Sequence, residues 1–283
     1  MFTRNFFIAA KSGVAAGLLL LLNACGGGGS NDFPPVVTAF KVQTLQYSRP
    51  ALIYIGGNDL RTTMTVESGG ACSSPSFSST STTSLLAFNC TVTQVGEMPL
   101  TVKDANGHVL YQTSVTVPKP QVTLVTSSGS VTMELDPAAA PITVNNFLSY
   151  VHSGYYANTL FHRVIAGFVA QGGGYTSGLV KKAGQSAPIT LESNKGLSNL
   201  RGTVAMARTN DPNSATSEFF VNLVANTFLD YQSAASPGYA VFGSVIQGMD
   251  VIDAIAAKST GTQNGFTDVP LTDVTVTSAS QVN

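Results

Sequence analysis

The sequence predicts a mainly β protein with two domains, a β-sandwich followed by a closed antiparallel β-barrel with two capping helices. From residue 35 onwards, short β-branched and apolar runs alternate with clusters of Gly, Ser, Asn and Pro. Only residues 144–151 and 251–256 repeat their apolar side chains at helical spacing. Pro118-Lys119-Pro120 lacks two backbone donors and separates the two sets of strands, which makes residues 118–120 a linker.

The composition excludes several classes of function. The 283 residues include 14 basic and 15 acidic side chains, so the net charge of −1 argues against a nucleic-acid-binding protein, which usually has a basic face. A hydrophobic fraction of 43% with only 10% charged residues is typical of a chain that fills a core. Three His residues leave little material for a metal site. We therefore expect no metal, and we expect no cofactor either, because Gly172-Gly173-Gly174 does not fit the nucleotide-binding pattern G-x-G-x-x-G.

Residues 1–24 have the pattern of an export signal. Arg4 and Lys11 precede an apolar run at 14–22 that is too short to cross a bilayer. The run ends in Leu22-Asn23-Ala24-Cys25, which resembles the lipobox of bacterial lipoproteins, in which the cysteine is acylated. An ordinary secretion signal with an incidental cysteine is the alternative.

The glycine run after Cys25 predicts a flexible tether over residues 25–34. Several acyl chains on Cys25 would anchor the protein stably to a lipid membrane, which places it in the periplasm of a bacterial cell envelope. Gly26, rather than Asp, follows the cysteine, and this favours the outer over the inner membrane.

Two further cysteines, Cys72 and Cys90, form an even pair in an exported chain. Such a pair predicts a disulfide, because exported proteins fold in an oxidising compartment. Neither cysteine has the spacing of a metal ligand.

Residues 35–117 carry about seven short strand patterns, which with one disulfide predict an immunoglobulin-like β-sandwich. Asn106-Gly107 lies between two of these patterns and predicts a hairpin, since both turn positions favour positive φ. This domain shows no catalytic constellation, and we expect it to act as a spacer or to contact a partner.

Residues 121–282 form the second predicted domain. Thr143 stands before the first amphipathic segment as a candidate N-cap, and Gly248 precedes the second. Two helices separated by many strands predict the barrel with its helical caps.

Five blocks in this domain are similar, in order and spacing, to those of the cyclophilin-type peptidyl-prolyl isomerases. The first is Phe161-His162-Arg163-Val164-Ile165-Ala166-Gly167-Phe168-Val169-Ala170-Gln171-Gly172-Gly173. The others lie at residues 202–208, 217–222, 228–230 and 239–243. The resemblance implies a cyclophilin-like barrel that catalyses cis-trans isomerisation of X-Pro bonds and assists folding of exported proteins.

That chemistry agrees with the residues present. Rotation of an X-Pro bond must overcome the resonance of the amide, a barrier of about 18–20 kcal/mol, but no covalent bond changes. An apolar slot for the proline ring and a donor aimed at the localising nitrogen lone pair are therefore sufficient. A guanidinium suits the second role, because it keeps its charge and holds its N–H groups in a fixed plane.

By resemblance, Arg163 is this donor and Gln171 orients it. The expected catalytic residues are Arg163, Phe168, Gln171 and Phe220. The expected substrate-binding residues are Val169, Ala207, Arg208, Glu218, Phe228, Leu229 and Tyr239. Strand alternation adds independent support, because Glu218 and Phe220 share a face opposite Phe219 and Val221.

Four residues depart from the family pattern. Ala166 stands where proline is usual and would loosen the turn before Phe168. Phe228 replaces a Trp found in many members, and loss of the indole donor predicts weak cyclosporin binding. Tyr239 replaces a His at the pocket edge. Glu218 replaces a Gln, and we expect it either to pair with Arg163 or to face solvent.

His162 is predicted to be structural, because on a regular strand it would point away from the face of Arg163. A hydrolase is set aside, since the chain has no G-x-S-x-G motif and no partner for a catalytic His.

The expected partners are proline-containing exported polypeptides and a lipid membrane, with no nucleic acid, and the chain is expected to be a monomer. Two other functions remain open. The barrel could hold proline segments without turnover, or the sandwich could be the working part of a surface scaffold, in which case deletion of residues 121–283 would leave the phenotype unchanged.

Overall fold

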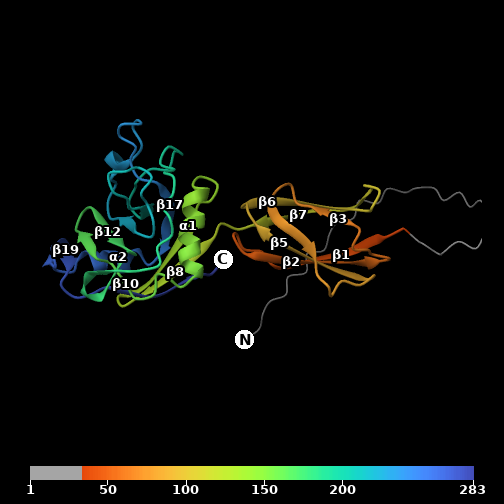
Figure 1. Cartoon of the computed structure of the whole chain (residues 1–283), viewed down its shortest axis with the longest axis horizontal. Coiled ribbons are helices and arrows are strands. Elements are labelled where there is room, and N and C mark those ends of the chain that lie inside the picture. Colours follow the sequence, from red (N-terminus) through yellow and green to blue (C-terminus); the bar gives the residue numbers. More distant parts are fainter. Residues whose placement is uncertain (1–33) are drawn as a thin grey trace, which may run out of the picture.

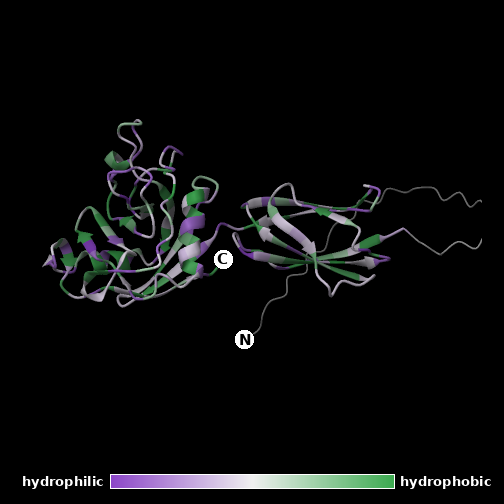
Figure 2. Cartoon of the chain, viewed as in Figure 1, coloured by the Kyte–Doolittle hydropathy of each residue, from purple (hydrophilic) through white to green (hydrophobic). Residues whose placement is uncertain are grey.

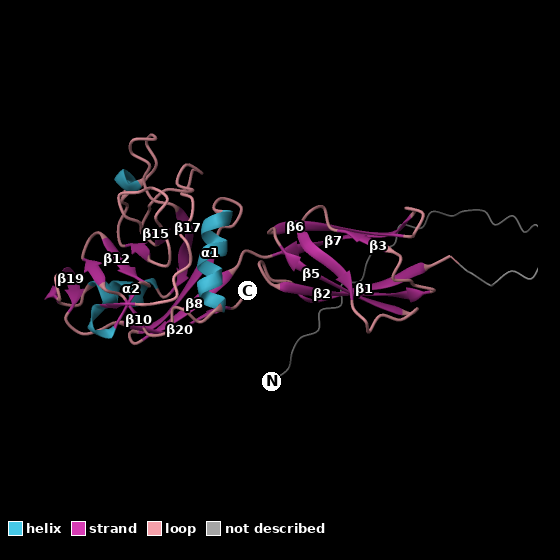
Figure 3. Cartoon of the chain, viewed as in Figure 1, coloured by secondary structure: helices cyan, strands magenta, loops and turns pink. Residues whose placement is uncertain are grey.

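The computed structural model describes residues 34–283 (Figure 1), and most of their regular structure is β-strand (Figure 3). The predicted signal peptide at 1–24, the acylation site Cys25 and residues 25–33 of the predicted tether lie outside the described residues. The mainly β fold class is confirmed. Among the described residues no helix has the length and apolar character needed to cross a membrane.

Seven strands make up the N-terminal half. They are β1 (Val36–Thr44), β2 (Pro50–Asn58), β3 (Thr65–Glu67), β4 (Cys72–Phe77), β5 (Leu85–Val92), β6 (Gly96–Lys103) and β7 (Val109–Val117). Strands β1-β2-β5-β4 form one antiparallel sheet and β3-β6-β7 form another. Figure 2 shows hydrophobic residues along these strands. Their buried side chains form one core, which includes Ile53, Phe88 and Leu100.

Strand β4 was not among the predicted strands. Its sequence, Cys-Ser-Ser-Pro-Ser-Phe, is mostly polar and contains a proline, and it lies at the edge of its sheet. An edge strand tolerates proline because one side of its backbone needs no partner. Seven strands in two sheets agree with the expected number, while the assignment to the immunoglobulin-like class stays a prediction.

The predicted disulfide is present. Cys72 on β4 and Cys90 on β5 are bonded, with their Cα atoms 5.4 Å apart. Because β4 and β5 are neighbours in one sheet, the bond fastens an edge strand rather than joining the two sheets.

The hairpin predicted at Asn106-Gly107 joins β6 to β7, which pair antiparallel. Only Gly107 has a positive φ, 85°. The turn is closed instead by Asp104, whose side chain accepts hydrogen bonds from the N–H groups of Asn106 and His108, both at 2.8 Å.

The C-terminal half contains a nine-stranded sheet in the order β10-β20-β8-β9-β17-β15-β16-β12-β11. The strands of this sheet are β8 (Gln121–Thr126), β9 (Gly129–Leu135), β10 (Thr159–Leu160), β11 (Arg163–Ile165), β12 (Val169–Gly172), β15 (Thr203–Met206), β16 (Phe219–Asn222), β17 (Val241–Gln247) and β20 (Thr275–Gln281). Two short hairpins add β13 (Tyr175–Thr176) with β14 (Val180–Lys181), and β18 (Thr260–Gln263) with β19 (Phe266–Pro270). The sheet curls with β10 and β11 at its edges, so closure into a barrel stays a prediction.

Two α-helices accompany this sheet, α1 (Pro141–His152) and α2 (Met249–Ala256), as the apolar spacing predicted. Short 3-10 turns lie at Ser177–Leu179 and Thr227–Leu229. The prediction that Thr143 caps α1 is wrong, because the helix begins at Pro141. Glu192 accepts hydrogen bonds from the N–H groups of Ile142 (3.2 Å) and Thr143 (2.8 Å). A carboxylate from a distant loop therefore caps the helix.

The core of the C-terminal half packs the helices on the sheet. Phe147 of α1 contacts Tyr156, Phe219 and Phe242, with ring centroids 5.1 to 5.7 Å apart. Tyr47, from the turn between β1 and β2, is buried against this core, and its carbonyl accepts a hydrogen bond from Gln281 at 3.1 Å. The domain bounds at 118–120 stay a prediction, although β7 ends at Val117 and β8 begins at Gln121.

Candidate active site

A row of five residues crosses the sheet on one face. Arg163 on β11 lies opposite Gln171 on β12, Gln171 opposite Phe220 on β16, Phe220 opposite Ala205 on β15, and Ala205 opposite Val241 on β17. Residues directly opposite in an antiparallel sheet point to the same face. The register therefore aligns a cation, an amide and an apolar surface.

The apolar end of this row forms a small cluster, separate from the main core. Its buried members are Val169, Ala205, Phe220 and Val241, and the partly buried residues packed on them are Phe168, Leu197, Ala207, Leu229 and Tyr239. Six of these nine are predicted site residues. Sequence analysis missed Leu197, Ala205 and Val241, although strand alternation within the 202–208 and 239–243 blocks could have found the last two.

Alternation in β16 separates this cluster from the core, as expected. Phe219 and Val221 pack into the main core, whereas Phe220 belongs to the apolar cluster. Phe168 is held by its carbonyl, which accepts hydrogen bonds from the N–H of Leu223 (2.9 Å) and the side chain of Asn226 (3.0 Å). Asn226 is buried and was not predicted.

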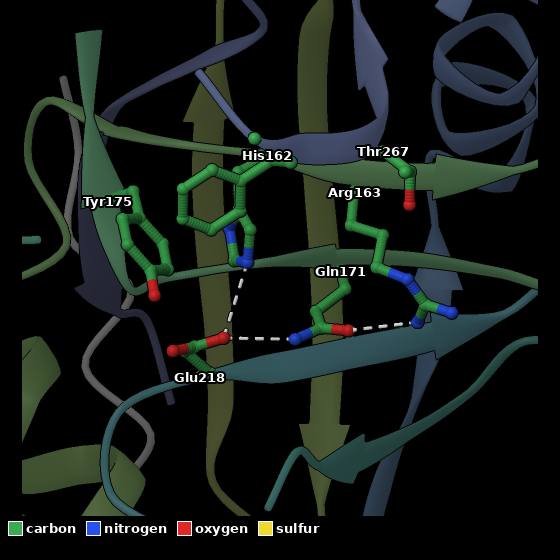
Figure 4. Close-up of a pocket in the computed structure, with 8 residues that line it drawn as sticks. His162, Arg163, Gln171, Tyr175, Glu218 and Thr267 are labelled. Atoms are coloured by element: carbon green, nitrogen blue, oxygen red, sulfur yellow. Dashed lines mark hydrogen bonds and ion pairs between the residues drawn. The ribbon is translucent and has the colours of Figure 1, made fainter. Parts of the chain in front are cut away.

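Arg163 and Gln171 are joined directly. Nη1 of Arg163 donates to Oε1 of Gln171 at 3.3 Å, and Figure 4 shows the guanidinium turned towards the Gln171 amide. This contact uses one donor of a group that has five.

Both expectations for Glu218 are wrong. Its Oε2 accepts a hydrogen bond from Nε2 of Gln171 at 2.9 Å and lies 3.2 Å from Nε2 of His162. With 22% of its side chain exposed, it neither pairs with Arg163 nor points freely into solvent. The β12–β16 register brings it to the amide of Gln171, which explains the difference.

The prediction that His162 faces away from Arg163 is also wrong. Strand β11 begins only at Arg163, so His162 lies outside the regular alternation. His162 is 3% exposed, and its ring packs on Tyr175, with centroids 4.7 Å apart. Figure 4 shows His162 and Arg163 at the same cavity.

This cavity, of about 350 Å³, lies beside Arg163. It is lined by His162, Arg163, Gln171, Tyr175, Glu218, Gly265, Phe266 and Thr267. The last three come from the β18–β19 hairpin, which no sequence signal connected with the site.

The family model for the cyclophilin type peptidyl-prolyl cis-trans isomerases matches residues 121–281, more than half of the chain. The chain belongs to the cyclophilin family. The predicted function, isomerisation of X-Pro bonds by an enzyme, is thereby confirmed at the level of the family.

Similar proteins with known names support the same family. This cyclophilin is 51% identical over 160 residues to peptidyl-prolyl cis-trans isomerase cyp18 of Streptomyces antibioticus, which covers 56% of this chain and 96% of that protein. It is 47% identical over 161 residues to peptidyl-prolyl cis-trans isomerase B of Escherichia coli, covering 56% and 98%. A solved Cryptosporidium parvum cyclophilin, crystallised in the presence of the dipeptide Ala-Pro, has a TM-score of 0.50 and 25% identity, covering 58% of this chain and 99% of that one.

Aromatic rings form the rim of the apolar cluster in this cyclophilin. Phe228 is 62% exposed and stacks on Phe168, with centroids 5.8 Å apart. Tyr239 meets Phe220 edge-on at 5.6 Å, and the guanidinium of Arg208 lies 4.5 Å from the Tyr239 ring centroid. Arg208 also donates to the carbonyl of Gly238, so its side chain covers this edge of the cluster.

Glu218 is held in its ionised form. Burial alone would raise its pKa, but the hydrogen bond and charge of His162, the hydrogen bond from Gln171 and the charge of Lys181 outweigh burial. The pKa of Glu218 therefore lies below the ordinary value of 4.5.

The arrangement suits bond rotation. An apolar surface lies beside a permanent cation, and an oriented amide joins the two. Among residues 34–283 no three His, Cys, Asp or Glu side chains are grouped as metal ligands.

Proposed function

We propose that this chain isomerises X-Pro bonds at the face where Arg163 and Gln171 adjoin the apolar cluster. One observation carries the proposal: the sheet register aligns Arg163, Gln171 and Phe220 on three adjacent strands. A proline ring seated on Phe220 would bring its X-Pro nitrogen within reach of the guanidinium.

The transition-state stabilisation that this site must supply is modest. An acceleration of about 10⁵ requires roughly 7 kcal/mol of transition-state stabilisation. As the bond twists, resonance is lost and the lone pair localises on the proline nitrogen. A guanidinium N–H aimed at this nitrogen stabilises the twisted state more than the planar one, which is the condition for catalysis.

The remaining residues divide between orientation and binding. Gln171 orients Arg163 and contacts the substrate backbone. Phe168, Val169 and Leu229 complete the proline pocket around Phe220. The substrate lies along the edge formed by Ala207 and the backbone of Arg208, and Phe228 and Tyr239 form the rim.

Turnover and binding can be measured separately on the full chain. We expect it to accelerate isomerisation of an X-Pro tetrapeptide, whose spontaneous step takes tens of seconds or more. Binding of the same peptide without acceleration would favour the second candidate, a module that holds proline segments. The intact Arg163, Gln171 and Phe220 favour the enzyme.

The cellular setting is part of the proposal. We propose a monomeric lipoprotein, acylated at Cys25 and held in the periplasm, at the outer rather than the inner membrane, where it acts on exported polypeptides. The residues 35–117 would form an immunoglobulin-like spacer, and residues 121–282 a closed cyclophilin barrel. The lipobox-like Leu22-Asn23-Ala24-Cys25 and the glycine run support the anchor.

The anchor has its own test. Cells that express the chain and are fed a labelled fatty acid should label the protein, and Cys25→Ala should remove the label and release the chain from the membrane fraction. An unlabelled wild-type chain in the soluble fraction would refute the anchor and leave the isomerase proposal intact.

A further inference from the structure

The side-chain amide of Gln171 has a partner at each end. Its Oε1 accepts from Arg163 at 3.3 Å, and its Nε2 donates to Glu218 at 2.9 Å. An amide that is rotated by 180° would present its NH₂ to the guanidinium, and two donors would then face each other. The direction of this amide therefore decides whether Arg163 has an acceptor.

Glu218 removes that ambiguity. An ionised carboxylate has only acceptors, so it can bond the NH₂ end of Gln171 and not the carbonyl end. Lys181 contributes a nearby positive charge, and His162 adds a second donor, which together favour the ionised carboxylate.

The position of the carboxylate is tightly set. His162, 3% exposed, holds Oε2 from one side, and its other ring nitrogen, Nδ1, has no hydrogen-bond partner among the described residues. A buried polar atom without a partner is uncommon. The ring therefore makes its polar contact through Nε2, with the carboxylate of Glu218.

Gly174 also limits where the carboxylate of Glu218 can lie. A Cβ at this position would lie 2.5 Å from Cγ and 2.6 Å from Cδ and Oε1 of Glu218. The carboxylate therefore occupies space that only glycine leaves free. Gly174 has an ordinary negative-φ backbone, so a side chain there acts through Glu218 rather than through backbone strain.

We propose that Glu218 is a positioning residue for isomerisation: its carboxylate holds the Gln171 amide with the carbonyl towards Arg163. In this role it acts on Arg163 through the side chain of Gln171, whichever contacts it also makes with a bound peptide. This inference rests on the proposed function for its kinetic consequence, while the orientation of the amide can be measured without turnover.

The kinetic test compares three variants of the full chain. Glu218→Leu removes the acceptor, and Glu218→Gln keeps an oxygen that can accept from both Gln171 and His162. Gly174→Ala pushes the carboxylate away and leaves its chemistry intact. Turnover of an X-Pro tetrapeptide gives kcat and KM separately.

We expect Glu218→Leu and Gly174→Ala each to lower kcat about tenfold, with KM within about twofold, because orientation acts on the transition state. Glu218→Gln should stay within about threefold of the wild type. In a Glu218→Ala background, Gly174→Ala should have no further effect, since the group it displaces is gone.

Side-chain ¹⁵N NMR of the folded proteins provides the independent readout. The Gln171 NH₂ signal should shift in Glu218→Leu and Gly174→Ala, and much less in Glu218→Gln. A folded Glu218→Leu protein with wild-type kcat and an unchanged Gln171 signal would overturn the proposal, and so would a Glu218→Gln protein as impaired as Glu218→Leu. If the wild type has no turnover, the isomerase proposal fails, and the NMR signals alone decide the orientation.

Discussion

Arg163 and Gln171 are register partners on adjacent antiparallel strands, and their side chains meet through a hydrogen bond of 3.3 Å. Residues in register keep their separation as long as the two strands stay paired. The backbone ladder therefore holds the two side chains beside each other, and the hydrogen bond to Gln171 orients the guanidinium before a substrate arrives. Such preorganisation is what makes a donor effective in catalysis.

The turn before Phe168 predicts a stabilising substitution. The N–H of Phe168 donates to the carbonyl of Ile165 at 3.0 Å, and Gly167 has a φ of 71°. This places Ala166 at the turn position where proline is favoured. We expect Ala166→Pro to raise the free energy of unfolding by about 0.4–1 kcal/mol, because it restricts the unfolded chain.

Chemical denaturation measures this change, and Ala166→Gly should move stability in the opposite direction. Turnover should stay at or above the wild-type level, since Phe168 keeps its place. A destabilised Ala166→Pro protein would show that the turn differs from this description.

The lowered pKa of Glu218 predicts a pH dependence. A depressed pKa in the folded protein means that the ionised form persists from neutral pH to below 4.5 and is lost as the pH falls through the lowered value. The ionised carboxylate also stabilises the folded protein, and this contribution is present at neutral pH and is lost as the pH falls through the lowered pKa. The carboxylate interacts through hydrogen bonds or charge with His162, Gln171 and Lys181, and through charge with Tyr155 and Tyr175.

We therefore expect kcat to be independent of Glu218 ionisation above pH 4.5 and to decline below it, while Glu218→Gln lacks this decline. Activity profiles of both proteins, over the range in which circular dichroism shows them folded, make the comparison. An identical acid decline in both would assign it to another group.

The disulfide predicts a local effect on stability. Cys72 and Cys90 are separated by 18 residues in sequence and pack in the core of the N-terminal half. For a loop of this size the chain-entropy model gives about 3 kcal/mol. Reduction, or the double change Cys72→Ala with Cys90→Ala, should destabilise this half by about that amount.

Isomerase turnover should not change, because neither cysteine contacts the apolar cluster around Phe220. Thermal unfolding and the tetrapeptide assay are the two measurements. Loss of turnover upon reduction, with residues 121–283 still folded, would show that the two halves depend on each other for activity.

Phe228 predicts the response to cyclosporin. Its ring is exposed and stacks on Phe168, but it carries no N–H donor. We expect weak binding by the wild type and at least about tenfold tighter binding by Phe228→Trp, since one added hydrogen bond contributes about 1.5 kcal/mol. Titration calorimetry with Phe228→Leu as the control tests this, and nanomolar binding by the wild type would contradict it.

Much of the site could be predicted because it depends on local alternation. Phe220 faces the apolar cluster and Phe219 the core, as a period of two requires. His162 escaped this rule because it lies one residue before its strand begins. The partners of Glu218 escaped it because they are set by the register of β12 with β16, which is a relation between distant segments.

A contact between distant segments also explains the wrong N-cap prediction for α1. The local sequence predicts an N-cap at Thr143, but the donors at the helix start are satisfied by Glu192, some fifty residues later. Strand β4 was missed because its polar residues carry no apolar pattern, and pairing with β5 alone makes it a strand. The sequence thus predicts patterns within a segment better than contacts between segments.

We propose Arg163 as the donor that drives isomerisation. Turnover of an X-Pro tetrapeptide by the full chain should fall about 100-fold or more in Arg163→Ala, with peptide binding retained. Arg163→Lys keeps the charge but loses the planar fork, and should recover only part of the activity. A folded Arg163→Ala protein that isomerises the peptide at the wild-type rate would contradict this role of Arg163.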